Sequence, residues 1–546
     1  MKLLIVGGVA GGASAATRAR RLSEAAQIVM FERGPDVSFA NCGLPYHISG
    51  TIADRNKLLV TTPAKLKARF NLDVRTRSSV EAINRQAKTI RVRDLATGNE
   101  YEEFYDKLIL APGAAPIRPP LPGLDLPSIF TLRNLQDMDR IKAAVDAGTK
   151  SAVVIGAGFI GLEMVENLVE RGIQTTVVEL QDQILPPLDK EMTTPLAEVL
   201  RAKGVPLLLS ESAESFEQTA NGIAVSLKSG QRVTAGLVIL GVGVRPENKL
   251  AVEAGLDVGP RGGIRVNDQL QTSDPDIYAV GDAIEVQDVV SGSPTQVPLA
   301  GPANRQGRLA ADHIFGRAVR YRGTQGTAIV GCFGKVAALT GASEKSLRRG
   351  GRPFRMIYIH PAQHAGYYPG AQQMVLKLLF EPEKGNILGA QCVGGEGVDK
   401  RIDVIAVAIQ AGMTVFDLEE MELCYSPQFG SAKDPVNMAG FVAANWLRGD
   451  HPQTDVMSVL DLPADQRPLL LDVRTPDEFN SGNIPGAINI PVDDLRASLG
   501  ELPRNREIAA YCQVGQRGYL ATRILQQAGF NVKNISGGYK TYLLWK

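Results

Sequence analysis

Two of the five cysteines lie in segments whose neighbours can support sulfur chemistry. Cys42 lies within residues 38–46, Ser-Phe-Ala-Asn-Cys-Gly-Leu-Pro-Tyr, and Cys512 opens residues 512–517, Cys-Gln-Val-Gly-Gln-Arg. A cysteine reacts as its thiolate, which a helix N-terminus or a nearby cation stabilises. Arg517 is such a cation for Cys512. The other three cysteines have neither redox nor metal-ligand spacing, so we interpret them as structural and expect no metal: Cys332, Cys392 and Cys424.

A glycine-rich turn near the start of the chain has the pattern of a dinucleotide-binding loop, although Val9 replaces its second glycine. The turn follows the apolar run of residues 2–7 and opens a helix rich in alanine and arginine. Such a turn lets a pyrophosphate approach the N–H groups of a helix N-terminus. Glu32 comes after the next predicted strand, where it would accept hydrogen bonds from a ribose. We expect the cofactor to contact these loop positions: Gly7, Gly8, Ala10, Gly11 and Gly12.

A second loop of this kind matches the full glycine pattern. It lies between predicted strands at 151–155 and 175–179, and the second strand ends at Glu179. A carboxylate there would bind a ribose 2′-hydroxyl and repel a 2′-phosphate, so we expect NADH to be preferred over NADPH. Glu163 follows the loop, and the sequence leaves open whether it approaches the nicotinamide or only packs. The expected cofactor contacts in the loop are Gly156, Gly158, Ile160 and Gly161.

Length and composition narrow the class of protein. A chain of 546 residues is too long for one hydrophobic core, and two nucleotide-binding units indicate an α/β protein with several domains. A net charge of +1 argues against nucleic acid as the main partner. No apolar run is long enough to cross a membrane, and few scattered cysteines favour a reducing, cytoplasmic location.

Residues 272–282, Thr-Ser-Asp-Pro-Asp-Ile-Tyr-Ala-Val-Gly-Asp, resemble the second flavin-binding motif of the two-dinucleotide-domain flavoprotein reductases. Residues 111–113, Ala-Pro-Gly, resemble the crossover motif of the same family. The resemblance implies FAD at the first loop and NADH at the second, with Asp282 holding the ribityl chain of the flavin and Arg33 beside the FAD. It also implies the following division: an FAD domain at 1–113 and 245–324, an NADH domain at 114–244, and an α+β dimerisation domain at 325–447.

Within that family, glutathione-reductase-type enzymes carry a second cysteine five residues after the first, where this chain has His47. Cys42 would therefore react with an external sulfur species. The motif at 38–42 and the Val-Ala-Gly-Gly turn at 9–12 resemble those of coenzyme A-disulfide reductases. The single-cysteine pattern also resembles that of NADH oxidases and peroxidases, but the flavin peroxidases have a histidine where Ala10 stands.

The resemblance extends to a coenzyme A site and to a homodimer with a shared active site. Arg18 and Arg21 share a helix face and would contact coenzyme A phosphates, although a solvated basic face would have the same pattern. Tyr367 and Tyr425 would reach the partner subunit's site and donate hydrogen bonds to a leaving thiolate. The remaining coenzyme A contacts implied are Ser14, Ser38, Asn41 and Lys433.

The C-terminal region resembles the rhodanese family of sulfurtransferases. After a polar linker at 448–456, residues 457–546 form an α/β pattern that contains the motifs at 471–479 and 482–491. Loop N–H groups would converge on the Cys512 sulfur, and Arg517 would stabilise a thiolate or persulfide. Four residues separate Cys512 from Arg517, whereas cysteine phosphatases need five, so the loop favours a sulfane sulfur.

The complete chain thus resembles a coenzyme A-disulfide reductase fused to a rhodanese, a group that includes NADH-dependent persulfide reductases. The resemblance implies an FAD- and NADH-dependent reductase of persulfides, polysulfides or coenzyme A disulfide. Cys42 would be the reducing thiol and Cys512 the sulfur carrier. Two alternatives stay open, an NADH oxidase or peroxidase and a sulfurtransferase with a redox-sensing flavoprotein part. A linker of about nine residues reaches at most ~30 Å, which allows either direct sulfur delivery or a diffusible coenzyme A persulfide.

Overall fold

A computed structural model describes all residues from Met1 to Lys546 and separates them into two compact units. The flavoprotein unit comprises residues 1–182 and 204–324. The interface–rhodanese unit comprises residues 183–203 and 325–546. None of the helices combines the length and the apolar character needed to cross a bilayer.

The flavoprotein unit contains a five-stranded parallel sheet in the order β19-β7-β1-β2-β3. The late strand predicted within residues 272–282 joins this sheet as β19 and pairs with β7. Leu3, Leu4 and Ile5 of β1 are fully buried, as the continuous apolar run predicted. The strands are β1 (Lys2–Val6), β2 (Gln27–Glu32), β3 (Asp73–Thr76), β7 (Lys107–Leu110) and β19 (Ile277–Ala279).

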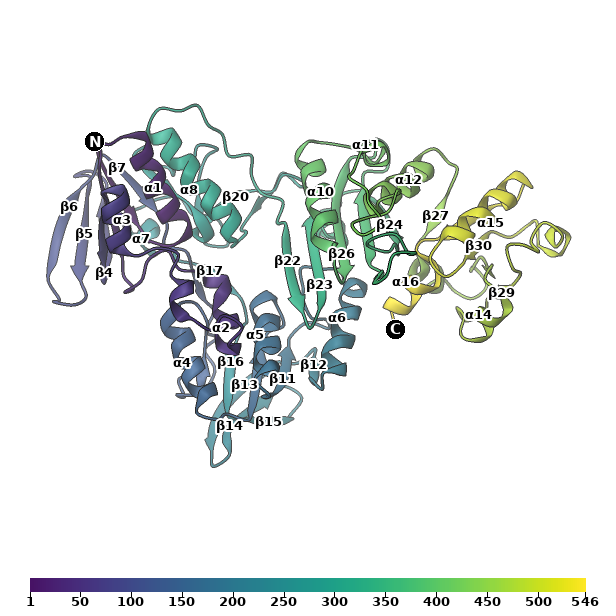
Figure 1. The fold of residues 1–546 in the computed structure, drawn as a ribbon, viewed down its shortest axis with the longest axis horizontal. Helices are drawn as coiled ribbons and strands as arrows, with labels where there is room; N and C mark the ends of the chain where they lie inside the picture. Colours follow the sequence, from purple (N-terminus) through teal and green to yellow (C-terminus); the bar gives the residue numbers. More distant parts are fainter. The chain divides into compact units, whose positions relative to one another are not determined.

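Helices α1 (Ala10–Leu22) and α8 (Ala300–Ile314) lie side by side next to this sheet (Figure 1). Their close approach depends on glycine, because a Cβ on Gly307 would lie 2.1 Å from the carbonyl oxygen of Gly11. The start of α1, which forms the predicted phosphate-binding turn, is thereby held against a second helix.

A second parallel sheet, in the order β12-β11-β10-β16-β9, carries the second glycine loop. Its central strand, β10, leads into that loop and then into helix α5 (Phe159–Glu170). The strands are β9 (Ile129–Phe130), β10 (Ser151–Ile155), β11 (Gln174–Glu179), β12 (Leu207–Leu209) and β16 (Leu237–Leu240).

Smaller elements complete the flavoprotein unit. The short antiparallel pair of β8 (Ala114–Pro116) and β17 (Val244–Pro246) joins the two segments where the chain crosses between the sheets. Other helices are α2 (Leu44–Ser49), α3 (Pro63–Phe70), α4 (Leu135–Asp146) and α7 (Lys249–Glu253). Antiparallel hairpin strands are β4 (Ser78–Asn84), β5 (Thr89–Asp94), β6 (Glu100–Phe104), β13 (Ala213–Thr219), β14 (Gly222–Leu227) and β15 (Arg232–Ala235). A last small sheet has β18 (Ile264–Arg265), β20 (Ile284–Gln287) and β21 (Pro294–Thr295).

The interface–rhodanese unit begins with an antiparallel sheet in the order β22-β23-β26-β25-β24, with α10 beside it in Figure 1. The strands are β22 (Ala328–Cys332), β23 (Lys335–Gly341), β24 (Arg355–Ile359), β25 (Val375–Phe380) and β26 (Ile387–Gly394). The helices are α6 (Lys190–Ala202), α9 (Glu344–Arg349), α10 (Val398–Gln410), α11 (Val415–Glu420) and α12 (Pro435–Leu447).

The C-terminal part has its own parallel sheet, in the order β27-β31-β30-β28-β29. Residues 453–454, within the predicted linker, form the edge strand β27 of this sheet. The strands are β27 (Gln453–Thr454), β28 (Leu469–Asp472), β29 (Ile488–Asn489), β30 (Ile508–Tyr511) and β31 (Val532–Ile535). The helices are α13 (Val456–Leu460), α14 (Pro476–Asn480), α15 (Gln516–Gln527) and α16 (Gly538–Leu544).

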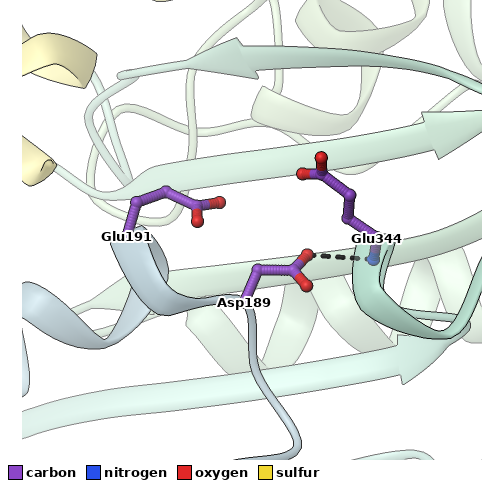
Figure 2. Close-up of side chains that lie close together, drawn as sticks. All are labelled: Asp189, Glu191 and Glu344. Atoms are coloured by element: carbon purple, nitrogen blue, oxygen red, sulfur yellow. Dashed lines mark hydrogen bonds between the residues drawn. The ribbon is translucent and has the colours of Figure 1, made fainter. Parts of the chain in front are cut away.

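A buried charge cluster fastens α6 to the interface sheet. Figure 2 shows Asp189, Glu191 and Glu344 with their carboxylates turned toward one another, an arrangement that a cation could occupy. The fully buried ammonium of Lys377 takes that place, 2.9, 2.7 and 2.6 Å from the three carboxylates in the same order. The hydroxyl of Tyr358 also donates to Glu191, at 2.9 Å. The cluster is therefore a structural ion network completed by the lysine.

Candidate active site

The first glycine loop is built so that only glycine fits at its two ends. A Cβ on Gly7, whose φ is +100°, would lie 2.0 Å from the carbonyl oxygen of Ala111. A Cβ on Gly12 would lie 1.9 Å from the carbonyl oxygen of Gly7. The Glu32 carboxylate accepts hydrogen bonds from the N–H groups of Gly8 and Gly34, at 2.9 and 2.8 Å, and thus lies at the loop where the sequence predicts a ribose.

The second loop repeats this geometry and adds a cradle. A Cβ on Gly161 would lie 2.0 Å from the carbonyl oxygen of Gly156, whereas a Cβ on Gly158 would meet nothing within 4 Å. The position where the motif needs its closest approach to a pyrophosphate therefore faces open space. The buried Glu179 accepts hydrogen bonds from the N–H groups of Ala157 and Gln181, at 2.7 and 2.8 Å. Both loops fit a bound dinucleotide.

Asp282 and Arg33, both predicted to contact FAD, differ in their surroundings: Asp282 is a partly buried carboxyl, whereas Arg33 is already paired with a carboxylate. Burial raises the pKa of the Asp282 carboxyl, against an opposing effect of Arg133. A carboxyl held in this way fits the hydroxyl donors of a ribityl chain. The exposed guanidinium of Arg33 is already engaged, with hydrogen bonds of 2.7 and 2.6 Å to Glu247.

The segment before Cys42 is tied to the first glycine loop. Ser38 has a φ of +49°, an uncommon conformation for a residue other than glycine. Its N–H donates to the carbonyl oxygen of Gly8 at 2.8 Å, and its carbonyl accepts from the N–H of Val60 at 3.0 Å. Strained backbone of this kind is typical of functional sites, and here it places Cys42 relative to the nucleotide loop.

Cys42 is an exposed free thiol in a short helical turn at Asn41–Gly43, just before α2. Desolvation raises the pKa of the Cys42 thiol, and the carboxylates of Glu163 and Asp282 raise it further. This direction is opposite to the lowering expected from a helix N-terminus. The physical reason is first the desolvation of the thiol and then the acidic side chains around it, both of which disfavour a thiolate.

Glu163 belongs to this site, a role that its sequence position alone left open. Burial raises the pKa of its carboxyl to about 7, and Glu166 raises it too. The hydroxyl of Tyr46 donates to Glu163 at 3.4 Å, and burial next to this carboxyl raises the pKa of Tyr46 to about 12. Its place two residues after the last loop glycine was a signal for its role, whereas nothing in the sequence singled out Tyr46.

His47 occupies the position of the missing second cysteine. It is buried, and its Nδ1 lies 2.6 Å from the carbonyl oxygen of Ile52. The ring therefore serves local packing and hydrogen bonding in α2. Cys42 has no disulfide partner in the chain, since all five cysteines are free.

The expected coenzyme A contacts are only partly free to bind a ligand. Arg18 donates hydrogen bonds of 2.8 and 2.5 Å to Asp312, while Arg21 is exposed. The hydroxyl of Ser14 donates to Asn304. Asn41, next to Cys42, donates to the carbonyl oxygen of Arg133 at 3.4 Å.

The other unit holds the remaining predicted site residues, three of which lie before its rhodanese part. Tyr367 and Tyr425 join through their hydroxyls at 2.8 Å, although 58 residues separate them in the chain. Both side chains are exposed, by 76% and 49%, and the hydrogen bond from Tyr425 raises the pKa of Tyr367. Lys433 is exposed just before α12. The structure thus brings the two predicted tyrosines together as one surface pair.

The Cys512 loop places a hydrogen-bond donor and a cation of the same domain next to a buried sulfur. Cys512 follows β30, and the N–H of Gly515 donates to its Sγ at 3.1 Å. The Arg517 guanidinium makes two hydrogen bonds of 2.7 Å to Glu478, and this contact raises the pKa of Arg517, as does the Cys512 thiol. The predicted cation therefore stands beside the sulfur, held in place by a carboxylate.

Arg474 is a second cation at this loop, and it was not among the residues predicted from the sequence. It is buried, donates to Asp472 at distances from 2.6 to 3.0 Å, and donates to the side-chain oxygen of Gln513 at 3.1 Å. Its guanidinium also stacks 4.2 Å from the ring centroid of Tyr539. An arginine two residues after the aspartate that ends a buried strand was the available signal.

Comparison with protein families defines the class of the chain. Residues 1–307 match the pyridine nucleotide-disulphide oxidoreductase family, residues 330–435 match the dimerisation domain of that family, and residues 456–544 match the rhodanese-like domain. The first match covers more than half of the chain, so the chain belongs to the pyridine nucleotide-disulphide oxidoreductases. Members of this family use FAD and NAD(H).

Individual relatives agree with this assignment. The chain is 37% identical over 444 residues to the coenzyme A disulfide reductase of Staphylococcus aureus, which covers 81% of this chain and 99% of that protein. The reduced Bacillus anthracis CoADR-RHD structure is 48% identical with a TM-score of 0.97, over 100% of this chain and 98% of that one. An NAD-dependent persulfide reductase structure from A. fulgidus is 35% identical with a TM-score of 0.92, and the match covers 99% of this chain and 100% of that one.

Proposed function

We propose that this chain is an NADH-dependent flavoprotein that reduces the S–S bond of persulfides, polysulfides and coenzyme A disulfide. One observation carries the proposal: Cys42 is exposed, lacks a cysteine partner, and lies in the unit with both dinucleotide loops. A thiol in this setting must exchange with an external disulfide or persulfide. The similarity to coenzyme A disulfide reductases and to a persulfide reductase points to the same substrates.

The proposed reaction balances through one mixed disulfide. The Cys42 thiolate attacks one sulfur of the substrate; a Cys42–sulfur bond forms, and the substrate S–S bond breaks to release hydrosulfide or a thiolate. Two electrons from NADH then break the Cys42–sulfur bond, and the second sulfur leaves. For a persulfide, one NADH and one proton yield one thiol and one hydrogen sulfide. The first glycine loop and Glu32 would hold FAD, which would supply the transfer of the electron pair between NADH and sulfur.

Residues of this chain have distinct parts in that reaction. Glu163 is half protonated near neutral pH and hydrogen-bonded to Tyr46, so it can hold or release a proton beside Cys42. We infer that the exposed Tyr367–Tyr425 pair serves the Cys42 site of a partner subunit in a homodimer, as a donor to the leaving thiolate. The contacts to coenzyme A would come from Arg21, Ser38, Asn41 and Lys433, and from Arg18 only if it leaves Asp312.

Cys512 is proposed to accept sulfane sulfur and to pass it on to a diffusible thiol. The linker before the sulfurtransferase domain is not a free tether in this structure. The N–H groups of Asp450 and His451 both donate to the carbonyl oxygen of Asn445, at 2.9 and 3.1 Å. The His451 ring lies 4.4 Å from the Tyr519 ring, centroid to centroid. A packed linker favours a coenzyme A persulfide shuttle over a swinging domain.

Anaerobic NADH oxidation tests the proposal with coenzyme A persulfide, coenzyme A disulfide and polysulfide measured side by side. We expect NADH loss coupled to sulfide or thiol release, and expect Cys42→Ser to abolish it. Cys424→Ser, which removes the other exposed cysteine, is the matched control and should leave it intact. NADH oxidation that needs oxygen or peroxide and ignores all three sulfur substrates would contradict the proposal.

A further inference from the structure

The cations beside Cys512 are neutralised within the sulfurtransferase domain. Arg474 is held by the buried carboxylate of Asp472, and Arg517 is held by two hydrogen bonds to Glu478. Each guanidinium can still orient the loop, but each already has an anionic partner. Recognition of an anionic sulfur donor therefore needs a positive charge from elsewhere around the loop.

Lys540 is such a charge, and its backbone is attached to the loop. Its N–H donates to the carbonyl oxygen of Gln513 at 3.0 Å, and the N–H of the preceding Tyr539 donates to that of Cys512 at 2.8 Å. Gly538 packs so closely that a Cβ there would lie 2.2 Å from the Cys512 carbonyl oxygen. The start of α16 is thus fastened along the first two residues of the sulfur-binding loop.

The side chain of Lys540 leaves the sulfurtransferase domain and contacts the interface domain. Its Nζ donates to the side-chain oxygen of Gln373, a neutral partner, and it forms no ion pair. The next residue, Thr541, is held by His360 of the interface domain at 2.8 Å. Desolvation lowers the pKa of Lys540, and burial together with Lys540 lowers the pKa of His360 to about 3. The lysine is thus a partly desolvated cation among neutral groups.

We propose that Lys540, held by Gln373 of the interface domain, is the anion contact that guides sulfur donors to Cys512. An uncompensated ammonium that has lost part of its hydration gains most from a ligand carrying an oxyanion. The ligand class is a sulfane-sulfur donor with a sulfonate or phosphate group. A small thiosulfate-like donor and the phosphates of a persulfidated coenzyme A share this chemistry.

The proposal rests on the sulfur-accepting role proposed for Cys512. In that step the Cys512 thiolate attacks the sulfane sulfur; a Cys512–sulfur bond forms and the donor's S–S bond breaks. The leaving sulfite or thiolate takes the electron pair, so no further oxidant or reductant is needed. Lys540 attracts the anionic end of the donor and does not exchange protons with the sulfur.

Alkylation of Cys512 in the full-length protein tests this contact without turnover. Iodoacetate is an anion and iodoacetamide is neutral, so the ratio of their rates at Cys512, followed by mass spectrometry of its peptide, reports the local charge. Lys540→Gln should lower the iodoacetate-to-iodoacetamide ratio by about two- to fivefold. Lys533→Gln removes the same charge from the same domain, at a lysine paired with Glu507, and should not lower it.

Three further comparisons separate recognition from damage to the fold. Lys540→Arg should restore the ratio, and the iodoacetamide rate alone should stay within about twofold of wild type if the loop is intact. Gln373→Leu should lower the ratio less than Lys540→Gln, since the charge remains but its support is lost. An unchanged ratio in Lys540→Gln would overturn the proposal.

Steady-state sulfur transfer then distinguishes the two donor sources. If Lys540→Gln raises the KM for thiosulfate alone, the group that Lys540 contacts is a small oxyanion. If it raises the KM for coenzyme A persulfide alone, that group is a coenzyme A phosphate. A rise for both assigns their shared charge, and no rise for either contradicts the proposal. Normal polysulfide turnover in Cys512→Ser would refute the loading role, while the alkylation ratio would still report on Lys540.

Discussion

The two sulfur-handling loops obtain their electrostatics from different sources. Cys512 is buried, its sulfur accepts a hydrogen bond from a backbone N–H, and Arg517 lies next to it; all these groups belong to residues 456–544, which match the rhodanese-like domain. Cys42 is exposed, with Glu163 and Asp282 as its charged neighbours, and its pKa is raised. The groups that contact the carrier sulfur therefore all belong to its own domain, and only the support of Lys540 comes from the interface domain. The reducing site depends on groups that come from outside the segment that carries the thiol.

This difference explains what each site can do. A sulfur carrier must hold a persulfide after the sulfur donor leaves and until the sulfur acceptor binds. This favours hydrogen-bond donors that are fixed parts of the protein. A reducing thiol must form and lose a sulfur bond in every cycle, so its thiolate is best stabilised only when cofactor and substrate are in place. Desolvation and the acidic neighbours Glu163 and Asp282 raise the pKa of Cys42, which lowers its thiolate fraction and so limits unproductive oxidation.

The largest effect should come from Cys42→Ser, which should inactivate the reducing site and leave the carrier site active. NADH-dependent reduction should fall by a factor on the order of 10³ or more, because the attacking sulfur is removed. Thiosulfate sulfur transfer by Cys512 should keep its wild-type rate. The two assays run on one preparation provide the check, and parallel loss of both activities would show that the sites are not independent.

Gly538→Ala should selectively damage the carrier site. The φ of Gly538 is +63°, and its added Cβ would lie 2.2 Å from the Cys512 carbonyl oxygen. Displacement of the loop should slow the alkylation of Cys512 by iodoacetamide about tenfold, with strain of about 1–3 kcal/mol. Gly529→Ala is the control, since its φ is +82° but its Cβ would meet only a flexible arginine tip at 3.6 Å. Equal rates for the two variants would argue against a rigid carrier loop.

Glu163→Gln should make Cys42 more reactive above neutral pH. The ionised carboxylate raises the pKa of Cys42, so its removal should speed alkylation at pH 8 by about two- to fivefold. Glu170→Gln, on the same helix but exposed, is the control. If Glu163→Gln reacted no faster than wild type, acidic neighbours would not govern this thiol.

The same variant should change stability in a pH-dependent way. The pKa of Glu163 is raised to about 7 in the folded state. The contribution of this carboxyl to folding stability is therefore complete below its pKa in the unfolded chain, and it is lost as pH rises through about 7. Glu163→Gln should therefore be more stable than wild type above pH 7, and the advantage should vanish toward pH 4. Thermal unfolding across this range measures it.

Glu478→Gln should have the smallest effect. Its hydrogen bonds with Arg517 lower the pKa of Glu478 to about 2, so its stabilising contribution is full above the unfolded value and lost as pH falls through about 2. The pair is partly exposed and should contribute about 1 kcal/mol or less. The difference in unfolding free energy between wild type and variant should be constant above pH 5 and shrink toward pH 2. A difference that grows with acidity would have the wrong sign.

Sequence patterns predicted the frame of the molecule better than the state of its thiols. Both glycine loops, the buried strands that precede them and the return of β19 followed from local patterns, because steric exclusion at Gly7 and Gly156 leaves few alternatives. The effect of Glu163 on Cys42 could not be predicted, because 121 residues separate them and only folding makes them neighbours. The engagement of Arg18 by Asp312 was hidden for the same reason.

One measurement tests the division of labour between the two sites most directly: anaerobic NADH oxidation by Cys512→Ser with coenzyme A persulfide and with polysulfide. We expect a wild-type rate with coenzyme A persulfide, which reaches Cys42 directly. We expect a strongly reduced rate with polysulfide, because Cys512 passes most of its sulfur to a thiol, and Cys42 then reduces the resulting persulfide. Wild-type rates with both substrates would contradict the carrier role of Cys512.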